Sequence, residues 1–116
     1  MQKIEKWRVE ELSLMLDQLA EILKRGDNCE WANVFYHFHH EAKVIISSEK
    51  FDLSKLKKLL TNIKNCFSGI SSLNNIVLWH ENPEEKVRIN QELQQTRVRL
   101  LKILAQMKDQ TQEYIS

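Results

Sequence analysis

Glycine and proline are scarce in this chain, whose 116 residues include two glycines and one proline. A β-sandwich or an α/β domain of this length has more turn-forming residues, because its many short elements need many tight connections. The scarcity therefore favours long helices joined by few connections. The length suits one domain with a modest hydrophobic core, so we expect residues 1–116 to form a single domain.

A large net charge is also lacking. Lysine and arginine number 17, aspartate and glutamate number 16, and the formal net charge is +1. A nucleic-acid-binding protein draws most of its affinity from a concentrated basic surface, and a DNA-mimicking inhibitor needs a strongly acidic one. The near balance argues against both classes, so we expect no nucleic-acid partner.

Long apolar runs and a cysteine framework are absent as well. No apolar run approaches the length of a membrane span, and Glu5, Glu10 and Glu11 interrupt the N-terminal apolar residues, which is not the pattern of a signal peptide. Two isolated thiols, Cys29 and Cys66, suit a reducing compartment, and we expect both to be buried small hydrophobic side chains. These features predict a cytoplasmic protein without a membrane segment.

The chain does contain apolar residues at spacings of three, four and seven, which is the pattern of amphipathic helices. The pattern predicts four helices, over about residues 4–24, 29–46 and 53–67 and from residue 83 onward. Trp7, Trp31 and Val34 fall on the apolar stripes, so we expect them in the core. Short connections place sequential helices antiparallel and side by side. The predicted fold is therefore all-α, a four-helix bundle with an irregular or short helical connection between the third and fourth helices.

Residues that start and stop helices mark the same boundaries. Gly26 is a C-terminal stop for the first helix. The expected N-terminal caps are Asp27 or Asn28 for the second helix, Asp52 for the third, and Asn82 for the fourth, with Pro83 in its first turn and Glu85 completing a capping box.

Histidines cluster in the second predicted helix. His37, His40 and Glu41 share one face at helical spacing, so a metal site built from these three is one hypothesis. That face lies opposite the predicted core, however, whereas the metal ligands of ferritin-like bundles point inward. His39 lies at the edge of the apolar face, where we expect a half-buried imidazole bonded to backbone.

Signatures of catalysis are missing. Gly26 and Gly69 have no glycine neighbours, so there is no glycine-rich phosphate loop, and no nucleophile is aligned with a base. Acidic residues at the start of the last helix are explained by the helix dipole. We therefore expect no enzyme activity and no cofactor.

The third predicted helix is locally basic. Lys55, Lys57, Lys58 and Lys64 lie mostly off its apolar face. No aromatic residues interleave with them for base stacking, so we interpret them as a solvated face.

Trp79 closes an apolar run directly before a polar turn. A half-exposed tryptophan in such a place either anchors a protein partner or packs over a helix end. With Tyr36, His80 and Glu81, Trp79 forms the candidate partner-binding set.

The connection over residues 67–79, FSGISSLNNIVLW, is the stretch with the least helical character. Gly69 can adopt the positive φ that ends the third helix. After it, either Ser71 or Ser72 caps a short helical turn carrying Leu73, Ile76 and Val77, or Ile76–Trp79 is a brief extended piece. The residues alone leave both open.

This arrangement resembles a family of small bacterial proteins found beside polymorphic toxins and thought to include immunity proteins. The matching positions are Trp31, Ala32 and Phe35, then Phe67, Gly69, Ser72, Asn74, Ile76, Val77 and Leu78, and then Asn90. Ser68 and Ser71 stand where the family pattern has glycines, and Asn75 stands where it has aspartate. The resemblance implies a non-catalytic protein that occludes a cognate toxin.

Two other functions remain as alternatives. One is the metal-binding bundle using His37, His40 and Glu41. The other is a homodimeric structural protein paired through the last helix, because Val98 and Leu101 broaden its apolar stripe.

Overall fold

The computed structural model describes residues 6–68 and 72–115, with the side chains of 109–115 left undescribed. Four α-helices and one short 3-10 turn make up the fold: α1 (Lys6–Arg25), α2 (Cys29–Ser47), α3 (Leu53–Asn65), η1 (Leu73–Asn75) and α4 (Pro83–Ile115). The described part of the chain contains no strand, and the predicted all-α four-helix fold is confirmed. The start of the first predicted helix at about residue 4 and the expected roles of Gly69 and Ser71 fall outside the described residues.

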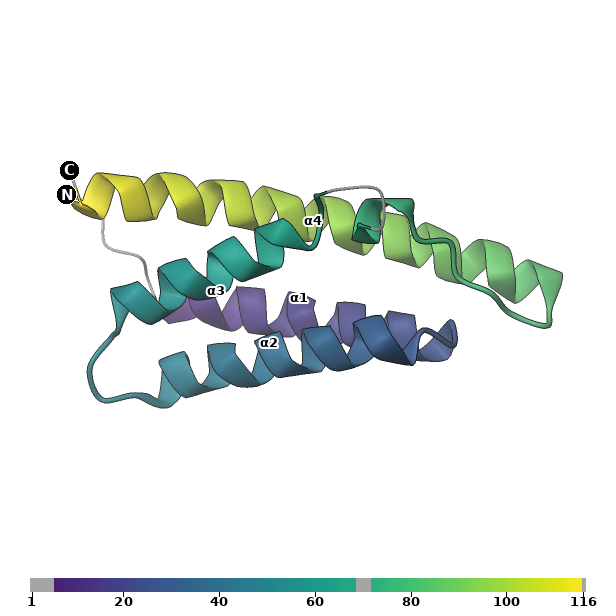
Figure 1. The fold of residues 1–116 in the computed structure, drawn as a ribbon, viewed down its shortest axis with the longest axis horizontal. Helices are drawn as coiled ribbons and strands as arrows, with labels where there is room; N and C mark the ends of the chain where they lie inside the picture. The colour runs from purple at the N-terminus through teal and green to yellow at the C-terminus, as the bar shows by residue number, and fades with distance from the viewer. Residues whose placement is uncertain (1–5, 69–71, 116) are drawn as a thin grey trace.

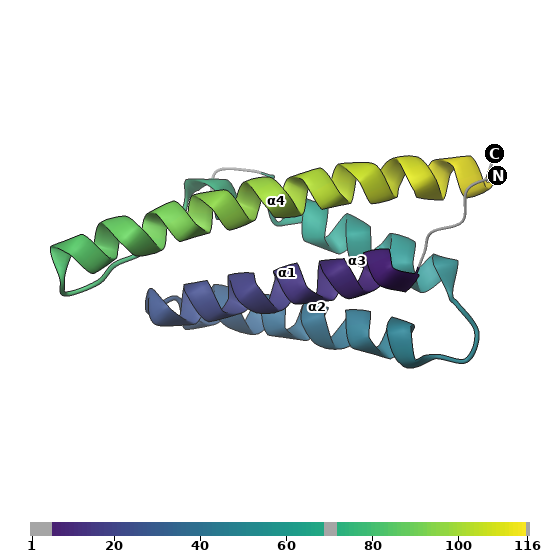
Figure 2. The same cartoon turned by 180° about the vertical axis from the view of Figure 1, so that it is seen from behind.

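The helices form an elongated bundle measuring 49 × 25 × 20 Å. α1 and α2 make an antiparallel hairpin, and α1 also packs against α4 (Figures 1 and 2). α3 has 13 residues and α4 has 33, so α3 covers only part of α4. After η1, the chain runs beside the N-terminal half of α4, the part that α3 does not cover (Figure 1).

The core runs through all four helices and includes the connection. Phe35 is fully buried at its centre, with its ring edge-on to Phe38 at a centroid distance of 5.4 Å. Leu73 and Leu78 from the connection are buried in the same core. The connection is therefore part of the packed structure. Its apolar side chains cover the part of the core that the short helix α3 does not reach.

Several residues expected in the core lie at its edge or outside it. Trp7 is 51% exposed, and its indole lies against the Arg8 guanidinium at 4.4 Å, because the buried stripe of α1 begins only at Val9. Trp31 is partly buried and packs on the core, whereas Val34 is exposed. The prediction for Trp7 and Val34 was wrong.

The two cysteines differ from each other. Cys29, the first residue of α2, is exposed, so its predicted burial was wrong. The half-buried Cys66 thiol donates to the Asn62 carbonyl at 3.4 Å, and burial raises the pKa of this thiol.

In the turn between α1 and α2, the reason for a glycine at position 26 differs from the helix stop that the sequence predicts. The Asn28 N–H donates to the Leu23 carbonyl at 2.9 Å and the Asp27 N–H to the Lys24 carbonyl at 3.1 Å, which is the Schellman pattern. Its positive-φ residue is Asp27, with φ of 60°, one position after the glycine. Gly26 is required for space instead, because a Cβ there would lie 2.7 Å from the Leu78 Cβ.

Replacing Asp27 by glycine should therefore stabilise the protein. A non-glycine residue in the left-handed region pays a steric cost, and a carboxylate beside a helix C-terminus opposes the dipole. We expect Asp27→Gly to raise the free energy of unfolding by about 0.5–1 kcal/mol in urea titration. Asp27→Asn changes the charge but keeps a side chain, so it should gain less stability than Asp27→Gly. If Asp27→Gly were no more stable than the wild type, this explanation would be contradicted.

The predicted N-terminal caps are confirmed. The side-chain oxygens of three residues accept backbone N–H groups: Asn28 from Trp31, Asp52 from Lys55, and Asn82 from Glu84 and Glu85. Glu85 does not complete a capping box, because the Asn82 N–H donates to His80 Nδ1 at 3.0 Å and the Glu85 carboxylate pairs with Arg88 at 2.9 Å.

Candidate functional site

The connection between α3 and α4 combines both conformations that the sequence left open. Leu73–Asn75 form the short helical turn, with the Asn75 N–H donating to the Ser72 carbonyl at 3.0 Å. Ile76 then has extended backbone angles, φ −80° and ψ 132°, and the chain stays non-helical through residue 80. The Leu73 N–H donates to the Cys66 carbonyl at 2.8 Å, which ties the turn back to the end of α3.

Asn90 of α4 holds the extended part by its backbone. Its Oδ1 accepts the Leu78 N–H at 2.7 Å, and its Nδ2 donates to the Leu78 carbonyl at 2.9 Å. The same Nδ2 also donates to the Lys86 carbonyl at 2.8 Å within α4. The amide thus supplies both partners that a neighbouring strand would offer Leu78, whose side chain is 1% exposed.

Arg97 holds the turn in the same way. Its Nη1 donates to the Leu73 carbonyl at 2.7 Å and to the Ile76 carbonyl at 3.4 Å, while its Nη2 donates to Gln94 Oε1 at 2.7 Å. Burial lowers the pKa of the Arg97 guanidinium. The two contacts to backbone carbonyls are charge-assisted hydrogen bonds, which are stronger than neutral ones, so they fix the turn.

Asn90 and Arg97 lie two helical turns apart on one face of α4, and both hydrogen-bond to the backbone of residues 73–78. With the backbone fixed, successive side chains of the extended part alternate in direction. Ile76 and Leu78 pack inward, whereas Val77 is 75% exposed and Trp79 is 58% exposed. We call Asn90 and Arg97 the clamp, because their hydrogen bonds fix the backbone of residues 73–78. Val77 and Trp79 are thus exposed to solvent on a backbone that is fixed to α4.

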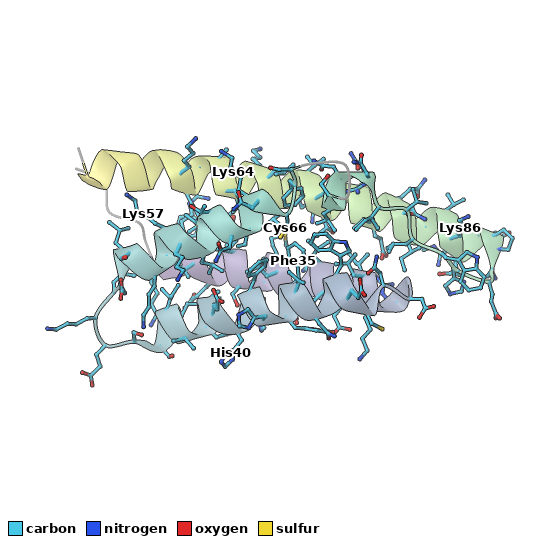
Figure 3. The ribbon with its side chains drawn as sticks, viewed as in Figure 1. Phe35, His40, Lys57, Lys64, Cys66 and Lys86 are labelled. Atoms are coloured by element: carbon cyan, nitrogen blue, oxygen red, sulfur yellow. The ribbon has the colours of Figure 1, made fainter. Side chains whose placement is uncertain are left out.

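Val77 and Trp79 leave the same side of the extended part, and Pro83 and Val87 are exposed in the first turns of α4; we call these four residues the outer patch. Val77, Pro83 and Val87 line one shallow depression, and Val87 is 58% exposed on α4. Lys86, which lies at this end of the molecule in Figure 3, and Gln91 border the depression. Apolar side chains gathered this way on a surface and edged by polar ones are typical of protein interaction sites.

The other candidate partner-binding residues divide between two places. His80 is partly buried beside Trp79, and Glu81 is exposed next to it. Tyr36 lies on α2, and its hydroxyl donates to Glu21 of α1. Tyr36 is thus tied to the α1–α2 hairpin, and the structure does not join it to the outer patch.

The Tyr36 hydrogen bond has a consequence that a titration can measure. Hydrogen bonding to the Glu21 carboxylate, with a smaller effect of burial, raises the pKa of Tyr36 from 10.0 to about 12. Because the folded pKa is raised, the contribution to stability is present below pH 10 and is lost as pH rises toward 12. In ultraviolet titration we expect one of the two tyrosines to ionise at about pH 12, and Tyr36→Phe to remove that step. A late step that survives in Tyr36→Phe would contradict the assignment.

The histidine cluster is arranged as ordinary surface and edge residues. His37 Nε2 pairs with Glu41 Oε1 at 2.7 Å, while His40 points into solvent (Figure 3). Within residues 6–68 and 72–108, no three His, Cys, Asp or Glu side chains are placed to hold a metal, so His37, His40 and Glu41 do not form the predicted ligand set. His39 is half-buried with Nδ1 2.9 Å from the Ser13 carbonyl, as expected.

The described residues at the positions that carry the family resemblance serve packing and turn formation. Ala32 and Phe35 are buried, Trp31 packs on the core, and Ser72 is buried where η1 begins. The Phe67 carbonyl accepts the Asn74 side-chain amide at 3.1 Å. Asn75 is exposed at the end of η1.

The sequence reasoning missed Arg97 and gave no role to Asn90. A signal was available, since both residues flank the apolar stripe of α4 on the same side and are separated by one heptad. Nothing in the sequence indicates, however, that backbone groups 12 residues before Asn90 and 21 and 24 residues before Arg97 need these side chains.

Comparison with protein-family models, curated proteins and solved structures found no match for the chain. Among the helices that the structure describes, none is both long and apolar enough to cross a bilayer.

Proposed function

We propose that this chain is a non-catalytic protein-binding protein that contacts its partner through the outer patch. The observation that carries the proposal is the clamp, in which Asn90 and Arg97 fix the backbone while Val77 and Trp79 stay exposed. Burying the exposed surface of Trp79 against another protein would be favourable, because it removes apolar area from water. A fixed backbone also reduces the ordering entropy lost when a partner binds.

The composition of the outer patch fits the centre of an interface. Tryptophan is enriched among residues that dominate binding energy, and such residues are surrounded by polar groups that exclude water. Lys86 and Gln91 line the depression, and Glu81 is exposed two residues after Trp79, so polar groups accompany the outer patch. A stable interface buries about 800 Å² per partner, so the patch would be the central part of a larger contact.

The class of partner follows from the family resemblance. We propose that the partner is a bacterial toxin and that this chain acts on it in the cytoplasm by occlusion, as an immunity protein does. In this mechanism the chain needs no catalytic group or cofactor, because masking the toxin surface is sufficient.

Growth rescue tests the proposed function. Each open reading frame beside the gene for this chain is expressed alone and together with the chain in a bacterial host. We expect one neighbouring product to arrest growth and the wild-type chain to restore it. Trp79→Gln should abolish the rescue, because loss of a central tryptophan costs about 2 kcal/mol or more of binding energy, roughly a 30-fold loss of affinity.

Leu14→Gln is the matched control for this assay. Leu14 is 60% exposed on α1, away from the connection, and glutamine keeps a good helix former there. Both variants should unfold at the wild-type temperature, and Leu14→Gln should still rescue growth. The proposal is overturned if no neighbouring product is toxic, or if Trp79→Gln protects as well as the wild type.

A further inference from the structure

A second surface feature lies between α3 and α4, and we call it the lysine groove. It has a volume of about 650 Å³ and is lined by Lys57, Leu60, Thr61, Lys64 and Asn65 of α3 and by Leu101, Leu104, Ala105 and Lys108 of α4. The two helices run antiparallel and diverge toward the start of α3 (Figures 1 and 2).

The floor of the groove is apolar and incompletely covered. Leu60 and Leu104 are nearly buried between the two helices, but Leu101 remains 37% exposed and Ala105 is exposed. Thr61 and Ala105 are small, so a third element can approach the helix pair closely there. The bundle thus leaves an apolar seam on this side that none of its described helices covers.

The charged residues that line the groove in the described part of the chain have one sign. Three of its lining residues, Lys57, Lys64 and Lys108, are cationic, and none of them is acidic. Lys57 and Lys64 form no ion pair within the described parts of the chain, and both lie along the space between α3 and α4 (Figure 3). They are separated by two helical turns, about 10 Å, which matches the heptad spacing of side chains on another helix.

We propose that the lysine groove binds an amphipathic helix of a partner protein, with apolar residues facing the floor and carboxylates one heptad apart facing Lys57 and Lys64. A helix laid in such a groove places its i, i+3/i+4 and i+7 side chains on the floor, as in other helix-in-groove complexes. The proposal does not depend on the outer patch or on the partner being a toxin.

Two other occupants fit the same observations less well. A symmetric second copy would bring the lysines of one groove against those of the other, since a two-fold interface pairs identical surfaces. Single-stranded nucleic acid would need stacking aromatics, and the lining has none.

A pair of designed peptides tests the proposal. Each is a fluorescein-labelled helix about three heptads long, monomeric at the working concentration, with identical apolar faces flanked by glutamates in one and lysines in the other. Fluorescence anisotropy should show that the wild-type chain prefers the glutamate peptide by about tenfold or more. The double variant Lys57→Glu/Lys64→Glu should reverse that preference, which a folding defect cannot mimic.

Lys55→Glu/Lys58→Glu is the matched control, because both residues are exposed on α3, lie outside the groove and give the same change of charge. This variant and Trp79→Gln should keep the wild-type preference, which separates the groove from the outer patch. The proposal is overturned if the two peptides bind equally, if the control loses the preference as fully as the groove variant, or if neither peptide binds while the chain dimerises or binds anionic phosphatidylglycerol vesicles.

Discussion

Asn90→Leu should lower the free energy of unfolding by about 2–4 kcal/mol, although it replaces a polar residue by an apolar one of similar size. The substitution leaves the Leu78 N–H and carbonyl without the partners that Asn90 now supplies at 2.7 and 2.9 Å. Leu78 is buried, so water cannot replace them unless the segment leaves the core. Urea titration measures the loss, and amide hydrogen exchange at Leu78 should quicken in parallel.

Gln95→Leu provides the control for this variant. Gln95 is exposed on the same helix, and its substitution likewise replaces a side-chain amide by leucine, but Gln95 makes no hydrogen bond to residues 72–80. We expect its stability to stay within about 0.5 kcal/mol of the wild type. If Asn90→Leu were equally mild, the hydrogen bonds to Leu78 would not be what holds the segment.

Gly26→Val should cost about 3 kcal/mol, because the site has no room for a side chain. A Cβ at residue 26 would lie 2.7 Å from the Leu78 Cβ and 2.8 Å from both of its methyl carbons. Leu78 cannot yield easily, since Asn90 fixes its backbone on the other side. Thermal or urea unfolding measures the loss, and Gly26→Ala should give a smaller one.

Lys24→Val is the control that tests whether a valine near the end of α1 is by itself enough to destabilise the protein. Lys24 is exposed in the last turn of α1, so we expect a loss below about 1 kcal/mol from helix propensity and the dipole. A Gly26→Val protein as stable as Lys24→Val would show that Leu78 does not occupy the place described.

The two large effects should not add. Both substitutions act on Leu78, one by crowding its side chain and the other by releasing its backbone. In the Asn90→Leu background the segment is already loosened, so Gly26→Val should cost about 1–2 kcal/mol less than it does alone.

The helices could be predicted from the sequence because their signals are local. The apolar repeat and the caps at Asn28, Asp52 and Asn82 each depend on residues within one or two turns, and the structure confirms them. Trp7 shows the limit of this reasoning. Periodicity assigns a face, but only the tertiary arrangement decides how far along a helix that face is covered.

The connection could be predicted only in part, because its conformation depends on contacts distant in sequence. The sequence identified Trp79 as a candidate anchor and proposed both a short turn and an extended piece. It assigned Gly26 to a helix stop, whereas the structure explains that glycine by Leu78, which lies more than 50 residues away along the chain. It also gave no role to Arg97, because the Leu73 and Ile76 carbonyls come within reach of the guanidinium only when the connection packs against α4.

We propose that Trp79, on a backbone fixed by Asn90 and Arg97, becomes buried when a protein partner binds. Fluorine NMR of the chain labelled with 5-fluorotryptophan tests this claim directly, since the three tryptophans give three resonances and Trp79→Gln identifies one of them. On addition of a neighbouring-gene product whose toxicity the chain is found to relieve, we predict that the Trp79 resonance shifts and loses its sensitivity to exchange of H₂O for D₂O. The Trp31 resonance should stay where it is. A partner that binds while the Trp79 resonance keeps its position and its solvent sensitivity would contradict the account.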